Sequence, residues 1–297
     1  MRDEYVFIEL EEKKRIIQSK NKATQHIFHQ QSTMANQTIT SFLMLPVELV
    51  YRILDHQTPY TILCSMRNTL ITLCLAYNSI GDDGVEHLAD ALQHNTTLTT
   101  LDVGHNEIAK VGAQHLGDAL QYNITLTVLS LIRNRIGDVG LQYLAAGLRH
   151  NATLTTLNLA RNGIDGVGAQ YLGDALQQNT TLTTLNLSGN GIREVGAQHL
   201  AAGLRHNTTL TTLYFQNNGI GDVGAQYLAD ALQHNTTLIT LNLAGSRIRE
   251  VGAQHLATRL RQNTTLTTLD LWENEIGDDV LHEINELVAW NKSGRKR

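Results

Sequence analysis

The sequence predicts an α/β solenoid, a stack of short repeats with parallel β-strands on one face and α-helices on the other. Leucine recurs with a period of 28 residues across residues 70–290, without insertion or deletion. Each period contains an alternating apolar segment followed by one with helical spacing. Both prolines precede residue 60, so none interrupts the repeats. Strands pack about 4.8 Å apart and helices about 8–10 Å apart. The stack should therefore curve into a horseshoe, with strands on the concave face.

Residues 1–38 are expected to be a flexible N-terminal segment. They carry 6 basic and 5 acidic side chains, and a short amphipathic helix could form around residues 7–17. Acids interrupt the first apolar stretch, which argues against a signal peptide. Two cysteines cannot form a disulfide framework, and no apolar run reaches the roughly 18 residues of a membrane span. We expect a cytoplasmic protein without membrane contact, with the nucleus as the alternative location.

Residues 39–69 follow a different, helical pattern. Pro46 suits the first position of a helix, and apolar residues follow it on one face. The Leu-Pro-x-Glu-Leu core and the later Ile-Leu pair resemble the first half of an F-box, which docks onto the Skp-type adaptor of cullin ubiquitin ligases. The resemblance implies these adaptor contacts: Leu45, Pro46, Leu49, Ile53 and Leu54. The third F-box helix is missing, so the alternative is a cap over the first repeat.

Residues 70–290 form about eight repeats, each with one strand and one helix. Residues 154–159, Leu-Thr-Thr-Leu-Asn-Leu, alternate as a strand does. Residues 164–176 have helical spacing, which predicts a buried stripe of Val167, Leu172, Ala175 and Leu176. Asp138 and Asp222 stand just before their repeats' helices and are expected to cap the free amides there.

A polar column recurs after each strand. Its members are Asn78, Asn106, Asn134, Asn162, Asn190, Asn218, Ser246 and Asn274. Together with the leucines and the Asn-x-Ile-Gly-Asp-x-Gly-Ala pattern, it resembles the 28-residue leucine-rich repeats of the ribonuclease-inhibitor type. Within that type, NOD-like receptors and the Ran GTPase-activating protein are most similar. The resemblance implies that each buried amide satisfies the turn after its strand. Ser246 is shorter, so its turn should be the loosest.

Two further columns favour structural roles. Seven Asn-x-Thr triplets, from Asn95 to Asn263, are formal glycosylation acceptors. Asparagine also tolerates the left-handed conformation that ends helices, and we prefer that interpretation. Histidine alternates with tyrosine at equivalent positions, such as His115 and Tyr143, which indicates packing on the outer helices. We expect no metal site and no cofactor.

The strand residues are the predicted binding surface, because a solenoid displays them rigidly. Most of them are monotonous Thr and Asn, so departures from the consensus are informative. Aromatic and arginine side chains dominate binding hot spots. The predicted protein-binding residues are Arg133, Arg161, Tyr214, Gln216, Trp272 and Glu273. Random drift of a repeat array is the alternative explanation.

The C-terminal end departs from the repeat. Beyond Ile276, apolar residues continue at helical spacing to Trp290, which predicts a terminal cap helix. Residues 291–297 form a basic tail carrying a charge of +4, which could be an address. Residues 70–290 hold 21 acidic and 11 basic side chains. Such an acidic body is a poor binder of nucleic acid.

These observations favour a non-catalytic protein–protein interaction scaffold, which could act as an F-box-type substrate receptor of a ubiquitin ligase. Nearly every polar residue has copies in other repeats, whereas a catalytic residue should be unique. One alternative is a GTPase-activating protein of the Ran-activator type, with Arg133 or Arg161 stabilising a phosphoryl group. Another is a ligand-sensing repeat protein related to NOD-like receptors. The chain has no Gly-Lys pair, and hence no phosphate loop.

Overall fold

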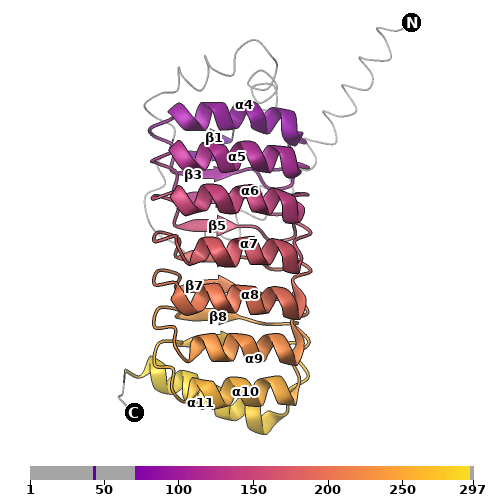
Figure 1. Ribbon diagram of the computed structural model, residues 1–297, viewed down its shortest axis with the longest axis vertical. Helices are drawn as coiled ribbons and strands as arrows, with labels where there is room; N and C mark the ends of the chain where they lie inside the picture. Colours follow the sequence, from indigo (N-terminus) through magenta and orange to yellow (C-terminus); the bar gives the residue numbers. More distant parts are fainter. Residues whose placement is uncertain (1–42, 45–70, 295–297) are drawn as a thin grey trace, which may run out of the picture. The chain divides into compact units, whose positions relative to one another are not determined.

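The computed structural model describes residues 43–44 and 71–294. The chain divides into two compact units, Met1–Leu43 and Met44–Arg297, and the repeats lie in the second. A two-residue strand, β1 (Leu43–Met44), precedes them. Within residues 71–294, eight strands alternate with eight helices, and the helices all lie on one side of the sheet, in order from α4 to α11 (Figure 1). The predicted fold class, an α/β solenoid, is confirmed.

The strands are β2 (Thr72–Cys74), β3 (Thr100–Asp102), β4 (Val128–Ser130), β5 (Thr156–Asn158), β6 (Thr184–Asn186), β7 (Thr212–Tyr214), β8 (Thr240–Asn242) and β9 (Thr268–Asp270). The helices are α4 (Gly81–His94), α5 (Lys110–Tyr122), α6 (Gly137–His150), α7 (Gly166–Leu176), α8 (Arg193–His206), α9 (Gly221–Leu232), α10 (Glu250–Leu260) and α11 (Asp278–Lys292). Consecutive strands pair in parallel with a register of 28 residues; Leu157, for example, lies opposite Leu185. The predicted period is therefore the physical spacing of the sheet.

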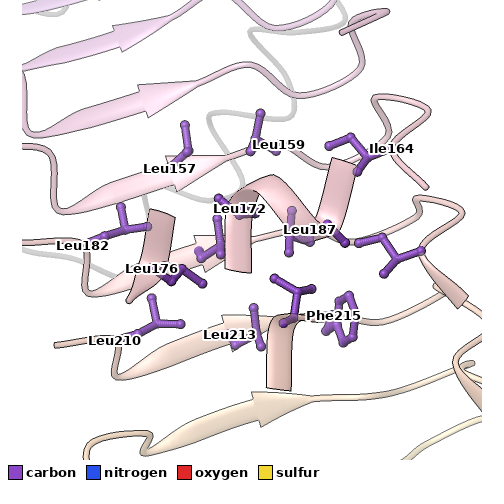
Figure 2. Packing of buried hydrophobic residues seen from close by; sticks show 14 of the residues in the cluster. Leu157, Leu159, Ile164, Leu172, Leu176, Leu182, Leu187, Leu210, Leu213 and Phe215 are labelled. Carbon is purple, nitrogen blue, oxygen red and sulfur yellow. The ribbon is translucent and has the colours of Figure 1, made fainter. Parts of the chain in front are cut away.

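The core is a column of leucine layers between the sheet and the helices. Each layer takes the central strand leucine, a second apolar residue after it and the apolar stripe of the helix. Figure 2 shows successive layers, with Leu157 and Leu159 followed by Leu187 and then by Leu213 and Phe215. These side chains are at most 1% exposed. The core is therefore continuous from one repeat to the next.

The expected stripe of α7 is wrong at one position. Leu172, Ala175 and Leu176 are buried, but Val167 is 55% exposed and Ala169 is buried in its place. Val167 lies in the first turn of α7, where the helix has just left the turn and its core-facing side is set by Gly168 and Ala169. Equivalent valines from Val111 to Val251 are 44–62% exposed, so the valine column lies outside the core.

The asparagine column after the strands joins neighbouring repeats. Asn134 Nδ2 donates to the carbonyl oxygens of Val103 and Leu131, both at 3.0 Å. Its Oδ1 accepts the amides of Asn106 and Ile108, also at 3.0 Å. The amide thus satisfies buried backbone in two repeats. Ser246 makes one side-chain hydrogen bond, of 3.4 Å to Ala244 O, and the looseness of its turn stays a prediction.

A second asparagine column lies at the helix ends, and its expected conformation is wrong. Asn95, Asn123, Asn151 and Asn207 have φ between −78° and −72°, in the extended region. They are suited to these positions by their amides. Asn123 Nδ2 donates to Leu92 O at 2.7 Å, and its Oδ1 accepts the amide of Leu126 at 2.7 Å. Most of the column is at least 95% buried, which supports the structural interpretation of the triplets.

The two aspartates expected to cap their own helices cap the next ones. Asp138 lies inside α6 and accepts the amides of Asp165 and Gly168, at 2.8 and 3.0 Å. Asp222 does the same for Arg249 and Gly252, at 2.7 and 3.0 Å. The first turn of each of these helices places its aspartate beside the backbone amides at the start of the following helix. Capping therefore couples repeats instead of acting within one.

Two helix pairs approach especially closely through glycine. A Cβ on Gly147 of α6 would overlap with the Gly117 carbonyl of α5, and a Cβ on Gly203 would lie 2.5 Å from Gly173 O. The equivalent positions in other repeats carry alanine or a larger side chain. These glycine pairs recur at 56 residues, so the array contains tight pairs of repeats.

The last repeat ends in the predicted cap. Val280 and Ile284 of α11 are buried, and Leu281, Leu287 and Val288 pack against the core. Asn291 Nδ2 donates to Leu266 O at 2.9 Å, whereas the helix-end asparagines of earlier repeats donate to the leucine 31 residues before them. Over the described residues, no helix is long and apolar enough to cross a membrane.

The helix-end asparagines should be more important for stability than their surface neighbours. Replacing Asn179 by alanine removes its bonds to Leu148 O, Thr181 N and Leu182 N. We expect Asn179→Ala to lower the free energy of unfolding by about 2–3 kcal/mol, because buried backbone groups lose their partners. Urea unfolding followed by circular dichroism measures this. The neighbouring exposed Thr180→Ala is the control, with an effect below about 0.5 kcal/mol; equal effects would contradict the assignment.

Candidate protein-binding face

We call the outer side of the sheet the strand face. In β2–β8 the central leucine is buried toward the helices, and the two flanking residues point outward. The strand face contains the last residue of each strand and the turn residue three positions later. The turn positions are Tyr77, His105, Arg133, Arg161, Gly189, Asn217, Gly245 and Glu273. Each turn residue lies one strand further along the sheet than the one before it, so the column crosses the whole strand face.

Four of these turn residues, Tyr77, His105, Arg133 and Arg161, form what we call the basic strip. The rings of Tyr77 and His105 stack, with centroids 3.9 Å apart. Arg133 and Arg161 are exposed, and the structure gives neither guanidinium an ion pair within the described ranges. Arg161 extends over Gly189, where an added Cβ would lie 3.0 Å from Arg161 Cγ.

The ring of His105 is harder to protonate than a free imidazole. Burial lowers the pKa of its ring, and the charges of Arg133 and Arg161 lower it further, against the opposing effect of Asp102. The two arginines therefore carry most of the positive charge of the basic strip. Asp102 lies beside the strip and accepts the amide of Gly104 at 2.9 Å.

The turn residues adopt a backbone conformation that favours glycine. Tyr77, His105, Arg133, Arg161, Asn217 and Glu273 have φ between 53° and 65°. This left-handed region costs a side-chain-bearing residue about 1–2 kcal/mol. Gly189 and Gly245 occupy the same conformation without that cost. The column therefore keeps six side chains in a conformation that glycine adopts more easily. Ser79, Glu107, Arg193 and Arg247, in the neighbouring turn columns, are also left-handed.

The opposite end of the strand face is acidic. We call Asp270, Trp272 and Glu273 the acidic end. Asp270 accepts the amide of Trp272 at 3.0 Å and the side-chain amide of Asn242 at 2.8 Å. The Trp272 ring is 71% exposed. The adjacent Glu275 is paired with Arg249 at 3.0 Å and so contributes little free charge.

The predicted binding residues form three separate places along this face. Arg133 and Arg161 lie on neighbouring repeats, Tyr214 and Gln216 on β7 and just beyond it, and Trp272 and Glu273 after β9. Tyr214 is 36% exposed, and the buried Oε1 of Gln216 has no hydrogen-bond partner in the described structure. Arg133 follows β4 and Glu273 follows β9, so a partner must extend along the face to contact all three. That these residues bind a partner stays a prediction.

Sequence reasoning missed two features. Tyr77 and His105 occupy the column of Arg133 and Arg161 at the same 28-residue spacing, which could have placed them in the strip. The second feature is a hollow of about 990 Å³ at the edge where the turns lead into α7, α8 and α9. It is lined by Gly163, Gly191 and Gly219, at a position where other repeats carry charged residues or serine. Glycine at this position in three successive repeats could have revealed it.

The expectation of structural histidines is consistent with the geometry. His115 and Tyr143 lie on the outer sides of α5 and α6 and are partly exposed. Among the residues the structure describes, no group of three or more His, Cys, Asp or Glu side chains could hold a metal ion. The adaptor-contact residues predicted from Leu45 to Leu54 lie outside the described residues.

Comparison with protein families decides the classification. The Leucine Rich repeat model matches residues 68–89, 94–117, 122–145, 150–173, 178–201, 206–229, 234–257 and 262–279. The chain belongs to the leucine-rich-repeat family. No curated protein matches it.

Two solved structures are similar to parts of this leucine-rich-repeat protein. One is the leiomodin-1 actin-binding site 2, at 23% identity and a TM-score of 0.43, covering 48% of this chain and 82% of that chain. The other is the Caenorhabditis elegans tropomodulin C-terminal domain, at 13% identity and a TM-score of 0.47, covering 52% of this chain and 94% of that chain.

Removing a strained side chain from the basic strip should stabilise the protein. Arg161 has φ 56°, and glycine accepts this conformation without a steric penalty. We expect Arg161→Gly to raise the free energy of unfolding by about 0.5–1 kcal/mol, after the larger conformational entropy of unfolded glycine is subtracted. Asn217→Gly, at φ 57°, is the control with a smaller gain because asparagine tolerates this region. Urea unfolding midpoints measure both; a loss of stability in Arg161→Gly would show that the arginine is held by packing.

Proposed function

We propose that this leucine-rich-repeat protein is a non-catalytic scaffold that binds another protein through its strand face. The observation that carries the proposal is the column of strained turn residues. It places aromatic and charged side chains, including two unpaired arginines, on one rigid surface at a conformational cost. Aromatic and arginine side chains are those that dominate protein interfaces. The repeat pattern also supports membership of the ribonuclease-inhibitor type. The low cysteine count supports the proposed location in the cytoplasm.

Site-specific photo-crosslinking tests the location of the interface. A photoreactive residue would replace Asn158 or Asn186 on the strand face, or Gln142 on the exposed side of α6. After irradiation in the native cell type, we expect protein adducts from Asn158 and Asn186 but not from Gln142. Adducts from Gln142 alone, or from none of the three, would contradict the proposal.

A ubiquitin-ligase receptor is the finer proposal. It rests on the Leu-Pro-x-Glu-Leu sequence that begins at Leu45, in the part of the chain that the structure does not describe. If this segment recruits a Skp-type adaptor, the scaffold would present its partner for ubiquitination.

Affinity capture tests the receptor proposal. We expect a Skp-type adaptor and a cullin to be retained by the wild type and lost in Leu45→Ala/Pro46→Ala, with other partners unchanged. Absence of both from the wild type would leave the segment as a cap for the repeats.

Two alternatives use the same surface differently. A GTPase-activating protein would place Arg133 or Arg161 against a phosphoryl group, and the exposure of both arginines is compatible with that use. Stimulated GTP hydrolysis that Arg133→Ala or Arg161→Ala abolishes would favour it. A sensor related to NOD-like receptors would instead bind a non-protein ligand on the strand face.

A further inference from the structure

We propose that the partner lies along the strand face with a segment of opposite charges at its two ends. Acidic side chains of this segment contact the basic strip, and a basic side chain contacts the acidic end. The inference rests on the proposed function, since it specifies the chemistry of the partner on the same face.

The charges left unpaired on this face carry the inference. Glu107 and Arg135, just beyond the basic strip, pair with each other at 3.4 Å, as Arg249 and Glu275 do beyond the acidic end. These pairs remove four charges from the edge of the face. In the turn column, two guanidinium groups remain at one end, with Asp102 beside them, and two carboxylates remain at the other. In the neighbouring turn columns, Arg193 and Arg247 also have no ion pair within the described residues, and they line a small hollow with Asn217 and Gly245.

The strand and turn positions in the middle of the face are uncharged, and the charges that border them are those of Arg193 and Arg247. From β6 to β8 the outward strand and turn positions are Asn186, Gly189, Tyr214, Asn217, Asn242 and Gly245. A ligand of one charge sign would therefore be attracted at one end and repelled at the other. A segment with separated charges is attracted at both ends, so the face selects the sequence and the direction of its partner.

The spacing of the repeats fixes the distance between these charges. Arg161 follows β5 and Glu273 follows β9, four strands further along the sheet. At about 4.8 Å per strand, the two turn positions lie about 19 Å apart. A partner in extended conformation would span this distance with about six residues. A helix would need about 13 residues.

Each end of the strand face has side chains that can bind a segment of the opposite charge. An arginine fork binds a carboxylate with two parallel hydrogen bonds, and neighbouring arginines on adjacent repeats can hold an acidic pair. The stacked rings of Tyr77 and His105 form a flat surface beside them. At the other end, the exposed Trp272 ring lies next to Glu273 and can cover the alkyl chain or the cation of a lysine or arginine.

The backbone provides an independent argument. Gly189 and Gly245 show that this turn accepts glycine. Arg133, Arg161 and Glu273 nevertheless retain charged side chains in the left-handed conformation. Within this turn column the charged side chains are located at the two ends, whereas the turns between them are glycine or asparagine. Arg193 and Arg247, in the neighbouring turn columns, are also left-handed, so the argument applies to this column alone.

Two synthetic peptides of identical composition test the inference with the full chain. The bipolar peptide is an alanine-rich helix with three glutamates at one end and three arginines at the other, about 13 residues apart. In the mixed peptide the same charges alternate. By fluorescence polarisation at low salt, we expect the bipolar peptide to bind about tenfold more tightly than the mixed one. The pKa of the His105 ring, followed by NMR, should rise when the glutamates bind beside it.

Charge reversal locates the contact. Arg133→Glu/Arg161→Glu should weaken binding of the bipolar peptide about tenfold. Adding Asp270→Asn and Glu273→Arg should restore it, because both carboxylates of the acidic end are then removed, the charge order of the face is inverted and the peptide can bind in the opposite direction. Arg205→Glu, on the exposed side of α8, makes the same change of charge elsewhere and should leave binding unchanged. Circular dichroism confirms that each variant is folded.

The outcomes separate this inference from the proposed function. Equal binding of the two peptides, or no binding of either, overturns the inference. An equal effect of Arg205→Glu, or no restoration by Asp270→Asn/Glu273→Arg, also overturns it. If the peptides give one of these negative results but Asn158 and Asn186 still form photo-crosslinks, the inference is wrong and the scaffold function is supported. The partner would then have a different chemistry.

Discussion

The side-chain amide of buried asparagine is the interaction on which the array depends. Leucine layers provide most of the driving force for folding, but apolar contacts are not directional and would tolerate a shift of one repeat against the next. An amide that donates to one repeat's carbonyl and accepts another's N–H allows one alignment only. Asn134 and Asn123 show this at opposite edges of the layer, one after the strand and one after the helix. With both edges fixed, the 28-residue register of the sheet follows.

This division of tasks explains why the strand face can vary. The core and the two asparagine columns satisfy most of the buried backbone. The last strand residues, such as Asp102 and Asn158, still accept the amide two positions later, so the exposed turn residues are the ones with the least structural role. A partner can then select their charge and shape without loss of the fold. The glycine pairs, Gly117 with Gly147 and Gly173 with Gly203, add tight contacts on the helical side and do not touch the face. The scaffold is therefore rigid where residues are repeated and specific where they are not.

The sequence predicted the features that depend on periodicity and missed those that depend on neighbours. Strand positions, buried leucines and the cap helix follow from apolar spacing, which one repeat contains in full. Asp138 and Asp222 were assigned to the wrong helices, because their acceptor atoms lie next to another repeat's amides. Val167 was placed in the core because helical spacing alone does not show which residues of the first helical turn face the core. Tyr77 and His105 were overlooked because each residue was compared with the consensus of its own repeat. Their stacking contact joins two neighbouring repeats and is not visible in such a comparison.

The left-handed turn links stability to binding in this fold. Glycine would be the more stable choice at every turn position, and two positions use it. Where a side chain remains, the turn holds it at the strand face with little freedom, because backbone and neighbouring repeat are both fixed. A strained, preorganised arginine loses less entropy on contact than a mobile one. If Arg133 and Arg161 contact the proposed partner, this smaller loss of entropy offsets part of the conformational cost that the two turns carry in the free protein.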